Sequence, residues 1–302
     1  MNRRLRKLIP AALILLVVGA LIMVAAMFSM KFDFRRLGTR RTVTNTYTPA
    51  GDFEDILIGI DTAELTFLPS EDGKLKVVCV EEEGMQHVVA VSDGTLSIQA
   101  VDTQRWHEKI GVGGEKTSVT VYLPKKEYGA LTLKTSTGDV TVPAAFRFRS
   151  VLMTGSTADI DFRAFTEGGV SIRTSTGDIS LDGLQADSLD LTASTGHIRV
   201  SASVIAGSVK VQTSTGEVGF TDLNCADARV KTTTGEVDLT RVLASASLRI
   251  ETDTGDVSGT LLTPKNFEAD TDTGRVKLPR SEPGGRCELK SDTGDFEISI
   301  VG

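Results

Sequence analysis

The pentapeptide Ser175-Thr176-Gly177-Asp178-Ile179 decides the fold of this 302-residue chain, because versions of it occur nine times. The shared pattern is a small or acidic residue, Thr, Gly, an acidic residue and an apolar residue. Successive glycine positions differ by 19 or 20 residues, and the nine copies begin at Ser136, Ser156, Ser175, Ser194, Ser214, Thr233, Asp253, Asp272 and Asp292. A fixed period of this length is typical of solenoid proteins.

The residues that flank each copy alternate in polarity, as expected for strands with one inward face. Two positions after the glycine position every copy is apolar, with Val140, Ile160, Ile179, Ile198, Val218, Val237, Val257, Val276 and Phe296. Five positions before it the residues are again apolar, with Leu133, Met153, Ile172, Leu191, Val211, Val230, Ile250, Ala269 and Leu289. A unit of this size cannot bury its own apolar face, whereas stacked units form a continuous core. The sequence therefore predicts an all-β fold, a parallel β-helix or β-solenoid with 19–20 residues per coil.

The Thr-Gly pair predicts a tight corner in each coil. Glycine supplies the positive φ that such a corner needs, and a threonine hydroxyl can bond backbone groups that the corner leaves unpaired. At the second copy Ala158 replaces the glycine, so we expect local strain or a different turn there. The predicted structural turn ladder consists of Thr137, Gly138, Thr176, Gly177, Thr195, Gly196, Thr215, Gly216, Thr234, Gly235, Thr254, Gly255, Thr273, Gly274, Thr293 and Gly294.

The residue after the glycine position is acidic in seven of the nine copies. Stacked carboxylates repel one another, so this edge needs compensation from peptide N–H groups, solvent or cations. The favoured interpretation is that the acidic residues satisfy the turn and keep the surface soluble. We assign no metal site and no cofactor, and name as candidates for a weak divalent-cation site Asp253, Asp256, Asp292 and Asp295.

Residues 8–30 form an uncharged apolar stretch that would be about 34 Å long as a helix, enough to cross a bilayer. We expect a retained single-pass anchor in the cell membrane, with the N-terminus cytoplasmic and the C-terminal domain extracytoplasmic, although basic residues flank both ends and the charge rule does not set the orientation. The alternative is a cleaved signal peptide. The chain then divides into a basic cytoplasmic tail (1–7), the transmembrane helix (8–30), a basic juxtamembrane linker (31–52), an N-terminal β region with a small β cap (53–130) and the solenoid repeats (131–302).

The region before the repeats also reads as strands. Asp61-Thr62-Ala63-Glu64-Leu65 resembles a degenerate tenth copy of the motif, and hairpins between Leu75 and Leu123 are expected to cap one end of the solenoid. A cap is needed because an open solenoid end exposes unpaired strand edges. The C-terminus has no equivalent segment, which predicts shielding of the last coil by self-association or by a partner.

Catalytic patterns are weak in this sequence. Asp-Thr-Gly is the aspartic-protease signature, but its three occurrences are successive copies of one repeat and do not indicate a pair of converging carboxylates. The three cysteines and three histidines show neither zinc-ligand spacing nor a nucleophile pattern. We therefore predict no catalytic residues and no enzyme activity. The net charge of −7 argues against a nucleic-acid partner.

The recurring Ser/Asp-Thr-Gly-Asp/Glu-Val/Ile motif behind an apolar N-terminal segment resembles the bacterial putative-adhesin family, whose β-strand repeats have no established function. The resemblance covers about residues 53–300. It implies a membrane-anchored parallel β-helix in the bacterial cell envelope, and it supplies no catalytic residues.

Three functions remain open at this point. The first is a non-enzymatic membrane-anchored surface protein, whose solenoid is an adhesin-like or envelope-binding surface with a protein or polymer partner. The second is a structural or regulatory accessory of an envelope-stress or other membrane system. The third and least favoured is a polysaccharide-acting β-helix enzyme, which would need longer loops with clustered carboxylates than these short connections provide.

Overall fold

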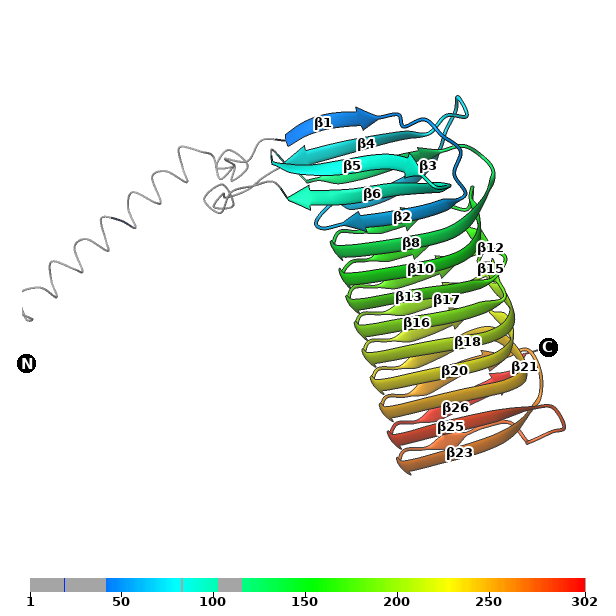
Figure 1. Ribbon diagram of the computed structural model, residues 1–302. Coiled ribbons are helices and arrows are strands. Elements are labelled where there is room, and N and C mark those ends of the chain that lie inside the picture. The colour runs from blue at the N-terminus through cyan, green and yellow to red at the C-terminus, as the bar shows by residue number, and fades with distance from the viewer. Residues whose placement is uncertain (1–18, 20–41, 83, 103–115, 302) are drawn as a thin grey trace, which may run out of the picture.

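Alternation of inward apolar and outward polar residues organises the chain into stacked β coils. The computed structural model describes residues 42–82, 84–102 and 116–301, together with Gly19. The described residues from 42 onward form an elongated stack with a cap at one end (Figure 1). Each repeat contributes one strand before the Thr-Gly corner to sheet B and one strand after it to sheet A, so that two parallel sheets run along the stack. The prediction of an all-β solenoid with 19–20 residues per coil is confirmed.

The strands of the repeat region follow the motif closely. Sheet B contains β8 (Glu127–Thr137), β10 (Arg147–Thr157), β13 (Gly169–Thr176), β16 (Ser188–Thr195), β18 (Val204–Thr215), β20 (Asn224–Thr234), the second part of β21 (Val237–Thr254), β23 (Lys265–Thr273) and β25 (Gly285–Thr293), with the short β12 (Phe165–Thr166) and β15 (Gln185–Ala186). Sheet A contains β9 (Val140–Val142), β11 (Ile160–Phe162), β14 (Ile179–Asp182), β17 (Ile198–Ser201), β19 (Val218–Thr221), the first part of β21, β22 (Val257–Leu261), β24 (Val276–Lys277) and β26 (Phe296–Ile300).

The core lies between the two sheets and is built from the two predicted apolar columns. Eight of the nine residues two positions after the glycine position are buried, and the ninth, Val276, is 49% exposed because β24 lies at the end of the stack. In the column five positions before the glycine position, Ala269 of the same end coil is the one member that is not fully buried. Aromatic side chains fill the core beside the cap, where Phe67, Phe146, Phe148 and Phe162 form a continuous series of ring contacts.

The N-terminal end of the stack is closed by strands whose order in the sheets differs from their order in the sequence. They are β1 (Thr42–Tyr47), β2 (Asp55–Ile60), β3 (Glu64–Pro69), β4 (Lys76–Glu82), β5 (Met85–Ser92), β6 (Thr95–Asp102) and β7 (Ser118–Leu123). The coil of β2 and β3 stacks between the coil of β6 and β7 and the coil of β8 and β9. Beyond it, β1 and β4 extend sheet A and β5 extends sheet B, all by antiparallel pairing. Part of the predicted linker 31–52 therefore joins the cap as β1.

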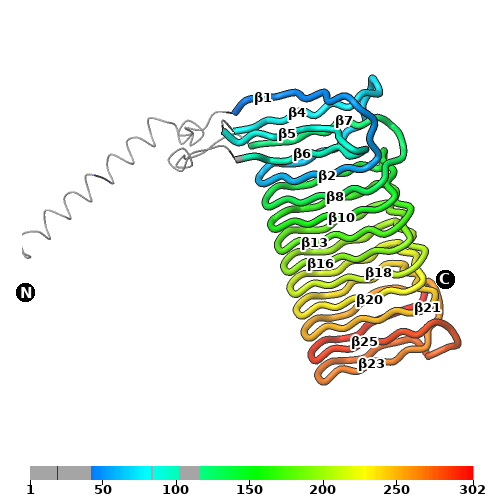
Figure 2. Tube along the Cα trace, in the orientation of Figure 1, coloured from blue at the N-terminus to red at the C-terminus, as the bar shows by residue number. Residues whose placement is uncertain are grey.

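The C-terminal end differs from the expected order of coils. Strand β25 pairs with β21 on one side and with β23 on the other, and β26 likewise lies between β22 and β24 (Figure 2). The final coil of the chain is thus inserted, with Phe296 fully buried, and the coil of β23 and β24 ends the stack. The sequence-based reason for self-association through the C-terminal coil was that this coil is uncovered, and that reason is wrong.

The predicted transmembrane helix at residues 8–30 lies outside the described residues, apart from Gly19. No helix among the described residues has the length and apolar character needed to cross a membrane.

The inserted coil predicts a specific pattern of disulfide formation. Glu251 is the register partner of Lys290, and Lys290 is in turn the partner of Asp270. Neighbouring strands lie about 4.8 Å apart, so the Cα atoms of Glu251→Cys and Lys290→Cys fall in the range of a disulfide. Glu251 and Asp270 are two strand spacings apart, roughly 9.6 Å, which a disulfide cannot span. Mild oxidation followed by mass spectrometry should crosslink Glu251→Cys with Lys290→Cys and leave Glu251→Cys with Asp270→Cys unlinked. The opposite result would show that the coils stack in sequence order.

Candidate functional site

The predicted Thr-Gly corners stack through backbone hydrogen bonds. The Gly196 N–H donates to the carbonyl of Thr215 at 3.0 Å, and the Gly216 N–H donates to the carbonyl of Thr234 at 3.0 Å. A Cβ atom on Gly216 would lie 2.0 Å from the carbonyl oxygen of Gly196, and Gly216 has a φ of +146°. The corner therefore requires glycine for space as well as for conformation. The threonine side chains of the predicted ladder are exposed, so in this ladder it is the carbonyls that link the coils.

A buried column of small residues, which the sequence reading missed, lies three positions before the glycine position. Its hydroxyl-bearing members include Thr135, Thr174, Thr213, Thr232, Thr252 and Ser291, all buried. The Thr174 hydroxyl donates to the carbonyl of Thr176 at 3.0 Å, across the corner. The signal was present in the sequence, because the column contains only Thr, Ser, Ala and Gly.

This column explains how Ala158 replaces a corner glycine. In that coil the column residue, three positions before Ala158, is Gly155. A Cβ atom on Gly155 would lie 3.1 Å from the Cβ of Ala158. The Ala158 methyl group is buried and occupies space that a threonine would otherwise fill. Ala158 is also absent from the residues with positive φ, so the turn differs and the backbone is not strained there.

A second corner, after each sheet A strand, was also missed. Gly183, Ala202, Asp222 and Arg241 occupy it in successive coils, with φ between 47° and 69°. Only one of the four is glycine, so no glycine repeat marks this corner in the sequence. Peptide N–H groups link these corners as well, for example from Ala202 to the Thr221 carbonyl at 2.9 Å.

The acidic residue of the motif accepts a peptide hydrogen bond from the neighbouring coil. The Asp178 N–H donates to Asp159 Oδ1 at 2.7 Å, and the His197 N–H donates to Asp178 Oδ1 at 2.8 Å. At the end of the stack the order follows the inserted coil, because the Asp295 N–H donates to Asp256 Oδ1 at 2.7 Å. These bonds offset the repulsion between stacked carboxylates.

Two of the four candidate cation ligands are already engaged in this ladder. Asp295 accepts hydrogen bonds from the backbone N–H and the guanidinium group of Arg275, and these bonds lower the pKa of the Asp295 carboxyl group. Asp256 accepts the Asp295 N–H, while Asp253 and Asp292 have exposed side chains. The four residues do not form a cluster of metal-ligating groups, and among the described residues the only such cluster is Cys79, Glu81 and His87 in the cap.

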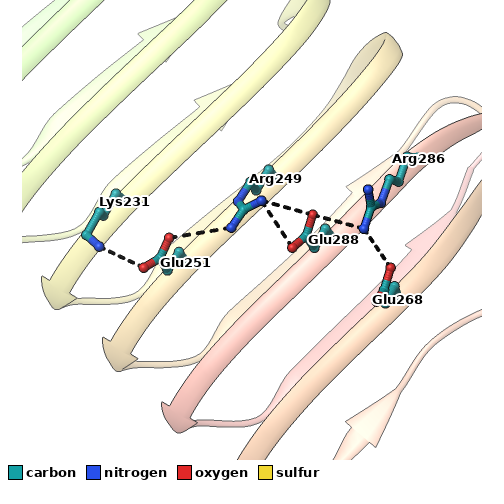
Figure 3. Close-up of polar contacts among 6 residues, drawn as sticks. All are labelled: Lys231, Arg249, Glu251, Glu268, Arg286 and Glu288. Atoms are coloured by element: carbon teal, nitrogen blue, oxygen red, sulfur yellow. Dashed lines mark hydrogen bonds and ion pairs between the residues drawn. The ribbon is translucent and has the colours of Figure 1, made fainter.

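Charges on the outer face of sheet B are neutralised by ion pairs across strands. Near the C-terminal end, cations and carboxylates alternate over β20, β21, β25 and β23 (Figure 3). The series contains the contacts Lys231–Glu251 at 2.7 Å, Arg249–Glu251 at 4.0 Å, Arg249–Glu288 at 3.2 Å, Arg286–Glu288 at 3.4 Å and Arg286–Glu268 at 2.8 Å. The three cations and three carboxylates of this series balance in charge.

A groove beside the cap has the opposite character. It has a volume of about 470 Å³ and crosses the turns of four successive coils on the side where the chain returns from sheet A to sheet B. Four cations and one carboxylate line it. We call it the basic groove and define it by Lys125, Lys126, Glu127, Arg147, Arg163, Phe165 and Gln185. The excess of cations is unusual in a chain whose net charge is −7.

Neighbouring groups hold three of the four cations of the basic groove in place. The Arg147 guanidinium lies 4.2 Å from the centroid of the Phe165 ring and 3.9 Å from Glu127. Arg163 makes two bonds of 2.9 Å to Asp161. Lys126 Nζ donates to the Phe53 carbonyl and lies 4.5 Å from the Phe53 ring centroid. An adjoining hollow of about 530 Å³ shares Lys126 and adds two lysines and two aspartates, Lys74, Lys76, Asp52 and Asp72.

The sequence model of the Toastrack DUF4097 family matches residues 53–280. The chain belongs to this family. The resemblance seen in the repeats is thereby confirmed. No curated protein matches the chain significantly.

Solved structures from Parabacteroides distasonis resemble this Toastrack chain. One is described as a putative adhesin, with 13% identity, a TM-score of 0.56 and coverage of 86% of this chain and 98% of the other. Another is described as a putative lipid binding protein, with 15% identity, a TM-score of 0.54 and coverage of 87% and 98%. At these identities the likeness shows that the Toastrack fold is shared.

The corner geometry predicts a large difference between two glycines of one coil. Gly216→Ala should lower the free energy of unfolding by roughly 2–4 kcal/mol, since the new methyl group collides with the Gly196 carbonyl at an unfavourable φ. Gly219→Ala is the control, because the nearest atom to its Cβ is 3.9 Å away in the Arg199 side chain. Denaturant unfolding of both variants tests this. Equal stability of the two would contradict the steric account.

The acidic ladder predicts that calcium has no effect on stability. Millimolar calcium should leave the melting temperature unchanged, because Asp256 and Asp295 already accept peptide N–H groups and Asp295 is paired with Arg275. Thermal melting with calcium and with chelator measures this. A rise with calcium that disappears in Asp253→Asn/Asp292→Asn would instead establish the weak cation site.

Proposed function

We propose that this protein is a non-enzymatic binding protein of the bacterial cell envelope, anchored in the cell membrane by residues 8–30 with the solenoid on the extracytoplasmic side. Its basic groove would bind an anionic, phosphate-bearing envelope polymer. The observation that carries the proposal is the charge of that groove, where the four cations Lys125, Lys126, Arg147 and Arg163 outnumber the two carboxylates that pair with them, Glu127 and Asp161.

The shape of the groove suits an extended ligand. It crosses four successive coils, so its cations are spaced along a line and do not converge on one point. Because three of the four cations are held by rings, carboxylates or a carbonyl, their side chains lose little entropy when a ligand binds.

The groove lacks the groups that glycoside hydrolysis needs. Such enzymes use a pair of Asp or Glu residues on either side of the scissile bond. The basic groove holds only Glu127, whose carboxylate lies 3.9 Å from Arg147. This supports binding over polysaccharide cleavage at this place.

The names of the structural relatives agree with a binding role. One is described as a putative adhesin and another as a putative lipid binding protein, and neither name refers to catalysis. Both names concern contact with a surface or a lipid, which supports an envelope location for this chain.

The proposal predicts weaker binding when the groove loses positive charge. Lys125→Ala/Arg147→Ala should lower affinity for poly(glycerol phosphate) about tenfold, equivalent to roughly 1.4 kcal/mol, because two cations are removed from the groove. The control is Arg173→Ala/Lys210→Ala, which removes equal charge from the sheet B face, where both residues lie near Asp190. Calorimetry with the polymer and with neutral dextran provides the measurement. Equal weakening by both pairs, or equal affinity for dextran, would refute the groove as the binding site.

A further inference from the structure

Three potential metal ligands meet inside the cap. Cys79 and Glu81 lie two positions apart on β4 and so share one face of the strand, and His87 lies on β5. One ligand atom from each residue lies within 4.8 Å of the other two. All three side chains are buried, with exposed fractions of 0%, 2% and 8%.

Residues of β1 and β5 hold the Glu81 carboxylate in a fixed orientation. Asn45 Nδ2 donates to Oε2 at 2.5 Å, and the backbone N–H of His87 donates to Oε1 at 2.5 Å. His87 Nδ1 lies 2.8 Å from the same Oε1 atom. Hydrogen bonds of this kind to a ligating carboxylate are typical of protein metal sites, because they fix the direction of its free electron pairs.

Of the two ring nitrogens of His87, Nδ1 is the one that faces the cluster, because it lies against Glu81 Oε1, and Nε2 lies on the far side of the ring. Nε2 is buried and has no hydrogen-bond partner among the described residues. A buried polar atom without a partner costs free energy, so such an atom in a folded protein calls for an explanation. A cavity of about 20 Å³, large enough for one water, lies beside the cluster and is lined by His87 and Glu81 but not by Cys79.

We propose that Cys79, Glu81 and His87 bind one divalent transition-metal ion of the zinc type. Thiolate, imidazole and carboxylate are the ligands that zinc uses in proteins, whereas calcium and magnesium require sets of oxygen ligands. Three protein ligands leave a fourth position for water. The ligand atoms need only small side-chain rotations to approach one ion, since they already lie within 4.8 Å of one another.

The place of the cluster in the fold assigns the ion a structural role. Strand β4 belongs to sheet A and β5 to sheet B, and the chain crosses between the sheets from Glu82 to Met85. An ion bound to both strands would tie the two sheets together at the capped end of the solenoid. The thiol of Cys79 gives up its proton when the metal–sulfur bond forms, and that proton leaves to solvent. Burial and the nearby Glu81 raise the pKa of the Cys79 thiol to about 12, so without a cation the thiol stays protonated.

Cobalt(II) and zinc(II) binding to the full chain tests this proposal. One equivalent of cobalt should give the near-ultraviolet charge-transfer band of a cobalt–thiolate bond, and zinc should displace it. Zinc should also raise the melting temperature by several degrees, because it binds the folded state. Absence of the thiolate band together with an unchanged melting temperature would overturn the proposal and leave a buried His–Glu pair.

Substitutions separate this cluster from the other buried thiols. Cys79→Ser and His87→Gln should each abolish the thiolate band or reduce zinc affinity at least tenfold. Cys225→Ser and Cys287→Ser are matched controls, because both cysteines are free and buried in the repeat region, and they should behave as the parent chain. Loss of the band in a control but not in Cys79→Ser would refute the assignment, and the measurement on the unmodified chain decides the case if a variant does not fold.

Discussion

Hydrogen bonds from corner glycines, as at Gly196, Gly216 and Gly235, to the threonine carbonyls of adjacent coils set the distance at which the coils stack. At that distance a Cβ atom on the glycine would lie about 2 Å from a carbonyl oxygen, as at Gly196, Gly216 and Gly235. The same contact fixes the register, because a one-residue shift would place a side chain where only a hydrogen atom fits. With the register fixed, inward-facing Val, Ile and Leu residues of successive coils lie above one another in columns. The corner contact therefore also determines how the core packs.

Features that repeat could be predicted from the sequence, and features that occur once could not. The apolar columns are visible because all nine copies agree, and the structure buries eight of the nine residues in each column. The inner column of small residues repeats equally well and could have been found. The corner of Ala202, Asp222 and Arg241 could not, because residues in the left-handed region there have no common side chain.

The order in which the coils stack could not be predicted from the repeat pattern, for a different reason. Copies that resemble one another can stack in any order, so the period does not distinguish a sequential stack from an inserted final coil. The end coil differs from the other coils in two ways. Val276 and Ala269 are less buried than the equivalent residues of other coils, and the coil contains the charged residues Glu268, Asp270 and Lys277. A charged end coil suits an exposed sheet edge, because charged side chains oppose pairing with another chain.

The basic groove and the cap cluster arise where the repeat is broken. Lys125, Arg147 and Arg163 lie in return segments whose sequences differ from coil to coil, so no motif brings them together before the coils are stacked. Cys79, Glu81 and His87 show no zinc-ligand spacing, and they meet because antiparallel strands of the cap bring β4 and β5 together. Along the repeats, by contrast, stacking places equivalent side chains beside one another and pairs the charges of sheet B, as between Lys231 and Glu251. Pairing of this kind balances many of the charges along the ladder, whereas the basic groove and the His87 imidazole lie near the irregular end of the solenoid.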